Sequence, residues 1–168
     1  MQANPGLQLA VSATTRAPRE GEENGRDYHF LSQQEFDQRV DAGEFVEHAE
    51  YAGNHYGTPR GPVRDAIASG RPALLEIELQ GARQVRKAEP DAQLVMLAPP
   101  DWDTLVERLT GRGTEDPHIV AARLEVARLE LGAENEFDVV VVNADVQAAA
   151  RELLTLVLGS STDKLERC

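Results

Sequence analysis

Cysteine is nearly absent from this 168-residue chain, since the only one is the last residue, Cys168. A single thiol cannot form an intrachain disulfide or a cysteine metal cluster, and the four histidines lack the spacing of zinc ligands. The chain also lacks any apolar run near the ~18 residues that cross a bilayer, and its N-terminus has no secretory signal pattern. We therefore expect one cytoplasmic domain, with neither secretion nor membrane insertion.

Basic residues are few, with 17 Lys and Arg against 29 Asp and Glu, for a net charge of −12. Proteins that bind a nucleic-acid backbone normally present a basic face, so we expect no polymer of this kind as a partner. Two arginines nevertheless fall close together, Arg16 and Arg19. A local arginine cluster on an acidic protein favours a small anion such as a single nucleotide.

The segment 12–30, SATTRAPREGEENGRDYHF, predicts a phosphate-binding loop. Arg16 and Arg19 can each grip an anionic group through two N–H donors, and Ser12 adds a hydroxyl. An alternative interpretation is a solvated loop in which the arginines only offset neighbouring carboxylates. Those carboxylates belong to Glu20, Glu22 and Glu23.

Short apolar runs alternate with amphipathic patterns, which predicts an α/β fold with a parallel sheet buried on both faces. The expected strands are 7–11, 73–77, 94–97 and 139–142. Ser32 and Glu35 form a capping box before a helix that Gly43 ends. Asp116 and Pro117 open another helix, as an N-cap and a first-turn proline.

We expect a single domain over 1–158, with two insertions that could move against a fixed sheet. The first, about 13–60, carries the arginine loop. The second, about 108–123, is rich in glycine and charge and has the character of a lid. A last helix is expected over 146–158, and the polar tail 159–168 is expected to fray.

The pattern S-x-x-T-T-R-x-P-R-x-G-E-x-x-G-x-D-Y is filled at every defined position from Ser12 to Tyr28. It resembles the nucleoside-monophosphate site of guanylate kinases of the bacterial type, and the similarity extends to about residue 158. The resemblance implies a P-loop nucleoside-monophosphate-kinase-like three-layer α/β fold with a parallel sheet, a GMP-binding insertion and a lid. It also implies ATP-dependent phosphorylation of GMP to GDP in purine nucleotide metabolism, with Mg²⁺ accompanying ATP.

The same resemblance implies a GMP site. Its phosphate ligands would be Ser12, Arg16, Arg19, Tyr28 and Tyr56. Within the segment 43–58, GEFVEHAEYAGNHYGT, Glu47 would accept from the guanine N–H groups and Thr58 would donate to O6. Taken alone, Glu47 would be interpreted as a surface carboxylate. Facing adenine, a buried carboxylate would cost roughly 1–3 kcal/mol for each unsatisfied group.

Glu76 and Glu78 lie two residues apart at the end of the expected strand 73–77, so both carboxylates should point to one side. The family usually has aspartate at the second of these positions and commonly at the first, so both glutamates depart from its pattern. We interpret Glu78 as a guanine-side ligand and give Glu76 an indirect role near magnesium or phosphate. Gln80 and Gly81 match the family's Q-G at the start of a helix.

The segment RLTGRGTEDPHIVAAR resembles the family's lid, whose arginines close over the ATP phosphates. The corresponding residues are Arg108, Arg112 and Arg123. For Arg108 and Arg112, four residues apart, the alternative is an exposed helical face. Asn143 matches a family position near the adenine of ATP, and its alternative is a turn residue after a strand.

The resemblance also reveals an absence, because the 168 residues contain no G-x-x-x-x-G-K-[ST] loop to cradle the ATP phosphates. Neither Lys87 nor Lys164 follows a glycine. We therefore expect an N-terminally shortened chain without the first strand and P-loop helix, through a misassigned start codon or deliberate shortening. Exposed strand edges would then lower stability, and activity would be impaired. The alternative function is a non-catalytic guanylate-kinase-like module that binds GMP or a phosphorylated partner.

Overall fold

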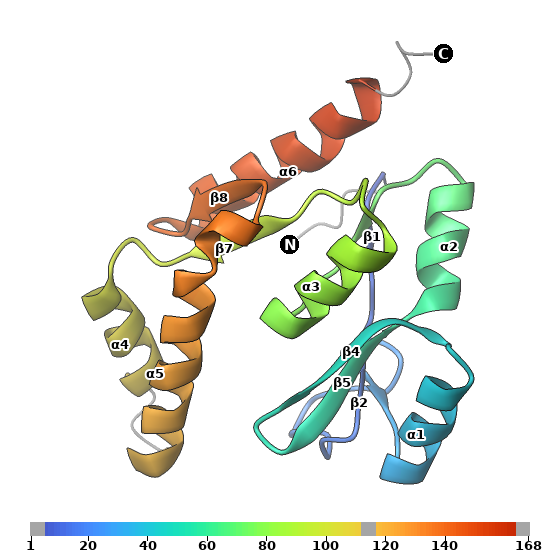
Figure 1. Cartoon of the computed structure of the whole chain (residues 1–168), viewed down its shortest axis with the longest axis horizontal. Helices are drawn as coiled ribbons and strands as arrows, with labels where there is room; N and C mark the ends of the chain where they lie inside the picture. Colours follow the sequence, from blue (N-terminus) through green and yellow to red (C-terminus); the bar gives the residue numbers. More distant parts are fainter. Residues whose placement is uncertain (1–5, 112–116, 164–168) are drawn as a thin grey trace. The chain divides into compact units, whose positions relative to one another are not determined.

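The computed structural model describes residues 6–111 and 117–163 (Figure 1). The chain divides into two compact units, Met1–Ala92 and Gln93–Cys168. They are called unit 1 and unit 2 below. Among the described residues, no helix is long and apolar enough to cross a membrane.

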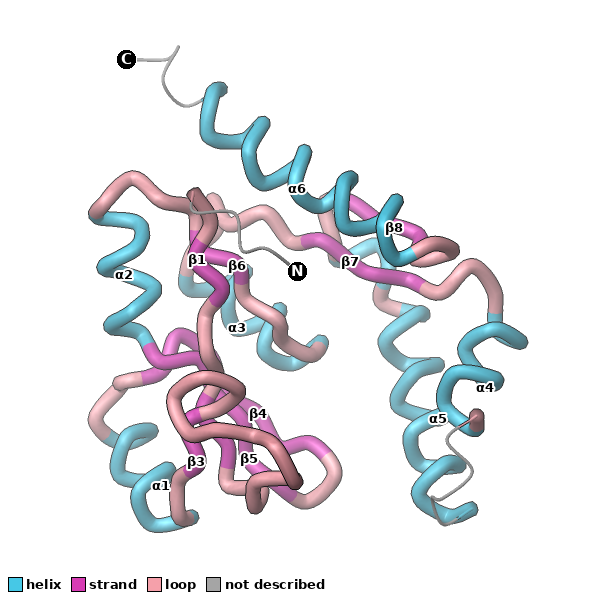
Figure 2. The backbone as a smooth tube through the Cα atoms, turned by 180° about the vertical axis from the view of Figure 1, so that it is seen from behind, coloured by secondary structure: helices cyan, strands magenta, loops and turns pink. Residues whose placement is uncertain are grey.

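One part of unit 1 is a parallel strand pair with two helices. Strand β1 (Gln8–Leu9) pairs with β6 (Ala73–Leu74), and Figure 2 shows them side by side. Helix α2 (Arg60–Ala68) precedes β6, and helix α3 (Leu79–Ala88) follows it. Both strands are shorter than the expected ranges. Strand β6 stops at Leu74 because the chain then turns toward α3, whose N-cap is Glu78.

The other part of unit 1 is a four-stranded sheet in the order β3-β2-β5-β4. Its strands are β2 (Ala13–Thr14), β3 (His29–Phe30), β4 (Phe45–Tyr51) and β5 (Asn54–Pro59). The hairpin between β4 and β5 turns at Ala52 and Gly53, whose φ values are 50° and 75°. Two successive positive φ angles are the geometry that matches the right-handed twist of hairpin strands.

Helix α1 (Gln33–Asp41) covers this sheet and begins at the expected capping box. The Ser32 hydroxyl accepts from the Glu35 amide, while the Glu35 carboxylate accepts from the Ser32 amide at 2.8 Å. The helix buries Phe36, which is 1% exposed and stacks on Phe45 with ring centroids 4.7 Å apart. This apolar contact is the core that fixes the position of strand β4.

Strand β4 contains an irregularity beside its first residues. Phe45 pairs with Pro59 but His48 pairs with Gly57, so two residues of β4 oppose the single residue Thr58. Such a β-bulge re-aims the side chains on the longer strand. Glu47 is one of the two residues of β4 that lie opposite Thr58 in this bulge.

Unit 2 contains a second parallel pair, β7 (Val95–Ala98) with β8 (Val139–Val142), in continuous register. Its helices are α4 (Trp102–Thr110), α5 (Pro117–Gly132), the short η1 (Glu134–Glu136) and α6 (Val146–Asp163). Asp101 caps α4 by accepting from the Thr104 amide at 2.7 Å. The Arg128 guanidinium lies 4.9 Å from the centre of the Trp102 ring, which ties α5 to α4.

In the residues described, the parallel strands are assigned as two pairs, β1 with β6 in unit 1 and β7 with β8 in unit 2. One expectation about these elements is corrected. The helix expected to end at Leu158 continues to Asp163, so the first residues of the expected tail are helical.

Candidate functional site

The arginine loop of unit 1 is an ordered structure with an internal ion pair. Two nitrogens of the Arg16 guanidinium donate to the two carboxylate oxygens of Glu22, at 3.1 and 2.9 Å. The same carboxylate accepts from the Arg19 amide at 2.7 Å. The Glu22 carboxylate raises the pKa of Arg16, and Arg16 and the Arg19 amide lower the pKa of Glu22. The ion pair that the alternative interpretation expects is therefore present between Arg16 and Glu22, although these two side chains are largely buried.

Arg19 differs from Arg16. Its side chain is exposed, and it forms no hydrogen bond or ion pair with any residue in the described ranges 6–111 and 117–163. A guanidinium presents five N–H donors, all of which remain available for an external anion. Arg19 is thus the cation of this loop best suited to receive a phosphate.

Two tyrosines stand beside the loop. Tyr56 on β5 is the register partner of Thr14 on β2, which brings it next to Arg16. The Tyr28 and Tyr56 rings meet edge to face, with centroids 6.2 Å apart. The Arg16 guanidinium lies 5.3 Å from the centre of the Tyr28 ring, within cation–π range. Two phenolic hydroxyls and a paired arginine therefore gather in one place beside the free Arg19.

A buried carboxylate lies at the β4 bulge. Glu47 is only 5% exposed, and its Oε1 accepts from the hydroxyl of Thr58, which is 0% exposed, at 2.6 Å. Burial raises the pKa of Glu47, and the nearby Glu78 carboxylate acts in the same direction. The hydroxyl and the backbone N–H of Thr58 both favour the ionised form of this carboxylate. A carboxylate has about four acceptor sites, so Glu47 keeps acceptor capacity for a donor from outside.

Glu78 comes to this site through helix α3. Its carboxylate caps the helix by accepting from the Gly81 amide at 2.7 Å. Gly81 in turn lies against Glu47, since a Cβ built at Gly81 would be 2.4 Å from Glu47 Oε2. The fold thus joins three of the predicted base-side residues, Glu47, Thr58 and Glu78.

Glu76 lies outside the strand that was expected to carry it, since β6 ends at Leu74. It is exposed in the segment between β6 and α3, and that segment is not a strand. The prediction that Glu76 and Glu78 share one side of a strand is therefore wrong. The spacing of the two carboxylates in the sequence cannot reveal that the second one, Glu78, caps a helix.

The predicted lid and adenine residues belong to unit 2. Arg108 is exposed on α4, Arg123 is half-buried on α5, and Arg112 lies outside the described residues. Asn143 follows β8, where its amide donates to the Ala98 carbonyl at 2.7 Å. The Asn143 Oδ1 atom is buried without a hydrogen-bond partner among the described residues.

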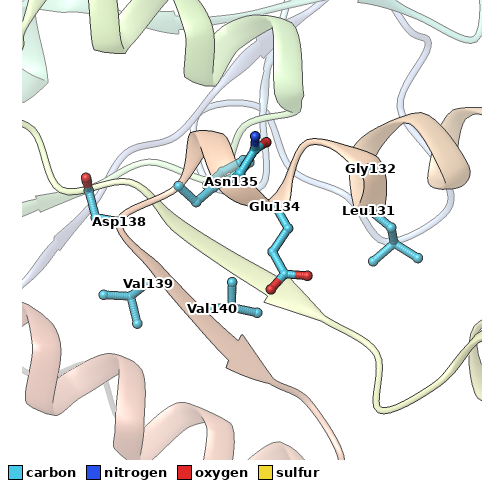
Figure 3. A pocket seen from close by; sticks show the side chains of 8 residues that line it. Leu131, Gly132, Glu134, Asn135, Asp138, Val139 and Val140 are labelled. Carbon is cyan, nitrogen blue, oxygen red and sulfur yellow. The ribbon is translucent and has the colours of Figure 1, made fainter.

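Unit 2 also carries an open cavity where α5 ends and β8 begins (Figure 3). Its lining residues include Leu131, Glu134, Asn135, Asp138 and Val140. None of the predicted site residues lines it, so this cavity gives no support to the predicted nucleotide sites.

Comparison with known proteins decides the family. The family model described as guanylate kinase matches residues 3–158. The guanylate kinase of Frankia casuarinae is 58% identical over 95% of this chain and 86% of its own length. The guanylate kinase of Thermobifida fusca is 56% identical over 94% of this chain and 81% of its own length. The chain belongs to the guanylate kinase family.

The fold agrees with this membership. The crystal structure of guanylate kinase from Anaplasma phagocytophilum superposes with a TM-score of 0.79 at 32% identity, covering 93% of this chain and 77% of that one. The expected α/β fold of the P-loop nucleoside-monophosphate-kinase type is therefore confirmed. The membership that the residues from Ser12 to Tyr28 suggested is confirmed as well.

The sequence left open which of three carboxylates would pair with Arg16, and the partner is Glu22. Two features of the candidate site were not predicted, the bulge beside Glu47 and the contact of Glu47 with α3. Both depend on residues brought together from different elements of the chain.

Proposed function

We propose that this guanylate-kinase family member catalyses ATP-dependent phosphorylation of GMP to GDP, with the GMP site in unit 1. The observation that carries the proposal is the buried pair of Glu47 and Thr58, in which the Glu47 carboxylate keeps acceptor capacity. Guanine presents N1–H and N2–H side by side, and a carboxylate can accept from both. Adenine presents an acceptor at N1, so it would leave this carboxylate unpaired.

In the proposed complex, the phosphate of GMP lies at the arginine loop. Arg19 supplies a charged donor, and the hydroxyls of Tyr28 and Tyr56 supply neutral donors. Arg16, held by Glu22, contributes positive charge from a fixed position. Ser12 adds a hydroxyl close to the start of the same loop. Glu78 completes the base side through the carboxylate that caps α3.

The proposed reaction needs no protein nucleophile. An oxygen of the GMP phosphate attacks the γ-phosphorus of ATP; that O–P bond forms as the bond to the β–γ bridging oxygen breaks, giving GDP and ADP. The protein's task is to align two phosphates and to offset their charge. We assign the charge-offsetting role to Arg108, Arg112 and Arg123. The side-chain amide of Asn143 is assigned to the adenine of ATP.

Magnesium fits this proposal as an ion that ATP brings with it. Among the residues described, no three His, Cys, Asp or Glu side chains gather as a metal site. Mg²⁺ keeps several waters and is commonly held by substrate phosphates with one or two carboxylates. Bound with ATP, the ion would offset phosphate charge, and the exposed Glu76 is the proposed indirect contact.

Calorimetry with GMP and AMP tests the base assignment. We expect the chain to bind GMP more tightly than AMP, and Glu47→Gln to remove most of this preference, because an amide presents only one acceptor. Equal affinity of the unmodified chain for the two nucleotides would contradict the role of Glu47. A non-catalytic guanylate-kinase-like module, the alternative function, would bind GMP with the same preference. Calorimetry therefore cannot distinguish the two functions, and a second assay is needed.

We further propose that the 168-residue polypeptide, assayed by itself, transfers the phosphoryl group slowly, because it holds no G-x-x-x-x-G-K-[ST] loop. A coupled assay of ADP release, run beside a full-length homologue, measures this directly. GMP binding with weak turnover is expected. Turnover equal to that of the homologue would refute the impairment, and GMP binding with no turnover at all would favour the binding module.

A further inference from the structure

Helix α3 holds the backbone next to Glu47 through one side chain. The amide of Gln84 donates to the His48 carbonyl at 2.6 Å and accepts from the His48 amide at 3.2 Å. Strand β4 is the last strand of its sheet, so without Gln84 these two backbone groups would have no strand to pair with. Gln84 therefore acts as a substitute strand partner directly beside the bulge that contains Glu47.

The same helix leaves space for the Glu47 carboxylate. Gly81 lies three residues before Gln84, so both residues face β4 from one side of the helix. A Cβ at Gly81 would lie 2.4 Å from Glu47 Oε2 and 3.1 Å from its Cδ. Since Glu47 is buried and bonded to Thr58, its carboxylate cannot move away freely.

We propose that Gly81 and Gln84 are positioning residues for guanine selectivity: Gln84 fixes the backbone beside Glu47, and Gly81 provides the space that its Oε2 occupies. Neither residue needs to touch the nucleotide. This inference rests on the proposed function of Glu47 as the base-reading group. Figure 1 shows α3 lying along the β4–β5 hairpin, the arrangement that both contacts require.

The test compares the affinities for GMP and IMP, which differ only in the 2-amino group that a well-placed carboxylate can bind. We expect Gly81→Ala to reduce the GMP-to-IMP preference ~10-fold, the order expected when one charged hydrogen bond is lost. Moving the carboxylate costs stability that the higher helix propensity of alanine only partly offsets, so the melting temperature should fall together with the selectivity. A merely structural role for Gly81 would lower the melting temperature and leave the GMP-to-IMP preference unchanged.

The matched control is Gly61→Ala on α2, because a Cβ at Gly61 meets nothing within 4 Å. For the second arm, Gln84→Met keeps the side chain's size but removes both bonds to His48, and Gln34→Met on the exposed face of α1 is its control. Both controls should keep the GMP-to-IMP preference of the unmodified chain.

The outcomes separate this inference from the proposed function. Should Glu47→Gln erase the preference while folded Gly81→Ala and Gln84→Met retain it, the positioning role is refuted and the base assignment stands. Should the unmodified chain show no preference, the base assignment itself is refuted. If Gln84→Met does not fold, Gly81→Ala still decides the question, because its substitution suits a helix.

Discussion

Replacing Arg19 with alanine should weaken GMP binding without weakening the fold. The Arg19 guanidinium is exposed and makes no hydrogen bond or ion pair within the described part of the chain, so its loss removes no internal contact. In the proposed complex it makes a charged hydrogen bond to phosphate, which contributes ~1.5–3 kcal/mol. That energy corresponds to a rise in Kd of roughly 10- to 150-fold.

Calorimetry with GMP measures this change, and thermal unfolding of the same samples checks the fold. Arg64→Ala is the matched control, because Arg64 is exposed on α2 and its loss changes the net charge equally. Arg16→Ala should differ from the Arg19 and Arg64 variants, because it removes the two hydrogen bonds that Arg16 donates to the Glu22 carboxylate. It should therefore lower the melting temperature as well as the affinity for GMP. An unchanged Kd in Arg19→Ala, or an equal loss in Arg64→Ala, would refute the reasoning.

Four further predictions concern the stability of the fold and the ionisation of two carboxylates. Phe36→Ala should lower the free energy of unfolding by ~3–5 kcal/mol in urea denaturation, because it empties the contact with Phe45. Ser32→Ala should cost ~0.5–2 kcal/mol by removing an N-cap, read by the same method. Glu22 has a lowered pKa, so its stabilisation should be full above the ordinary carboxyl range and lost as the pH falls through its folded value. Burial raises the pKa of Glu47, so the folded state binds this proton more tightly than the unfolded state does. The unmodified chain should therefore lose stability relative to Glu47→Gln as the pH rises from the ordinary carboxyl range through the raised pKa. Parallel profiles of stability against pH for the two proteins would contradict this prediction.

Local chemistry explains the elements that the sequence predicted well. The capping box at Ser32 and the helix end at Gly43 depend on residues only a few positions apart, so their patterns are complete in a short window. Strand β8, Val139–Val142, has the predicted bounds because four consecutive valines favour an extended, buried strand. The loop that contains Arg16 and Arg19 was also predicted from a short continuous segment, residues 12–30.

The contacts that shape the base site could not be found in this way. The bond between Gln84 and His48 spans 36 residues, and the contact of Gly81 with Glu47 joins the same two elements. The bulge at Glu47 places two residues of β4 opposite Thr58, but buried positions still alternate along β4, so the sequence pattern does not reveal it. Glu78 was assigned to the base, and its use as a helix cap depends on where β6 ends.

A crystal structure of this chain with GMP tests the account's central claim most directly. We expect the guanine edge to lie on Glu47 Oε2 beside Thr58, with the phosphate bound by Arg19 and the two tyrosine hydroxyls of Tyr28 and Tyr56. A base bound away from Glu47, or a phosphate that leaves Arg19 without contact, would contradict the proposed GMP site.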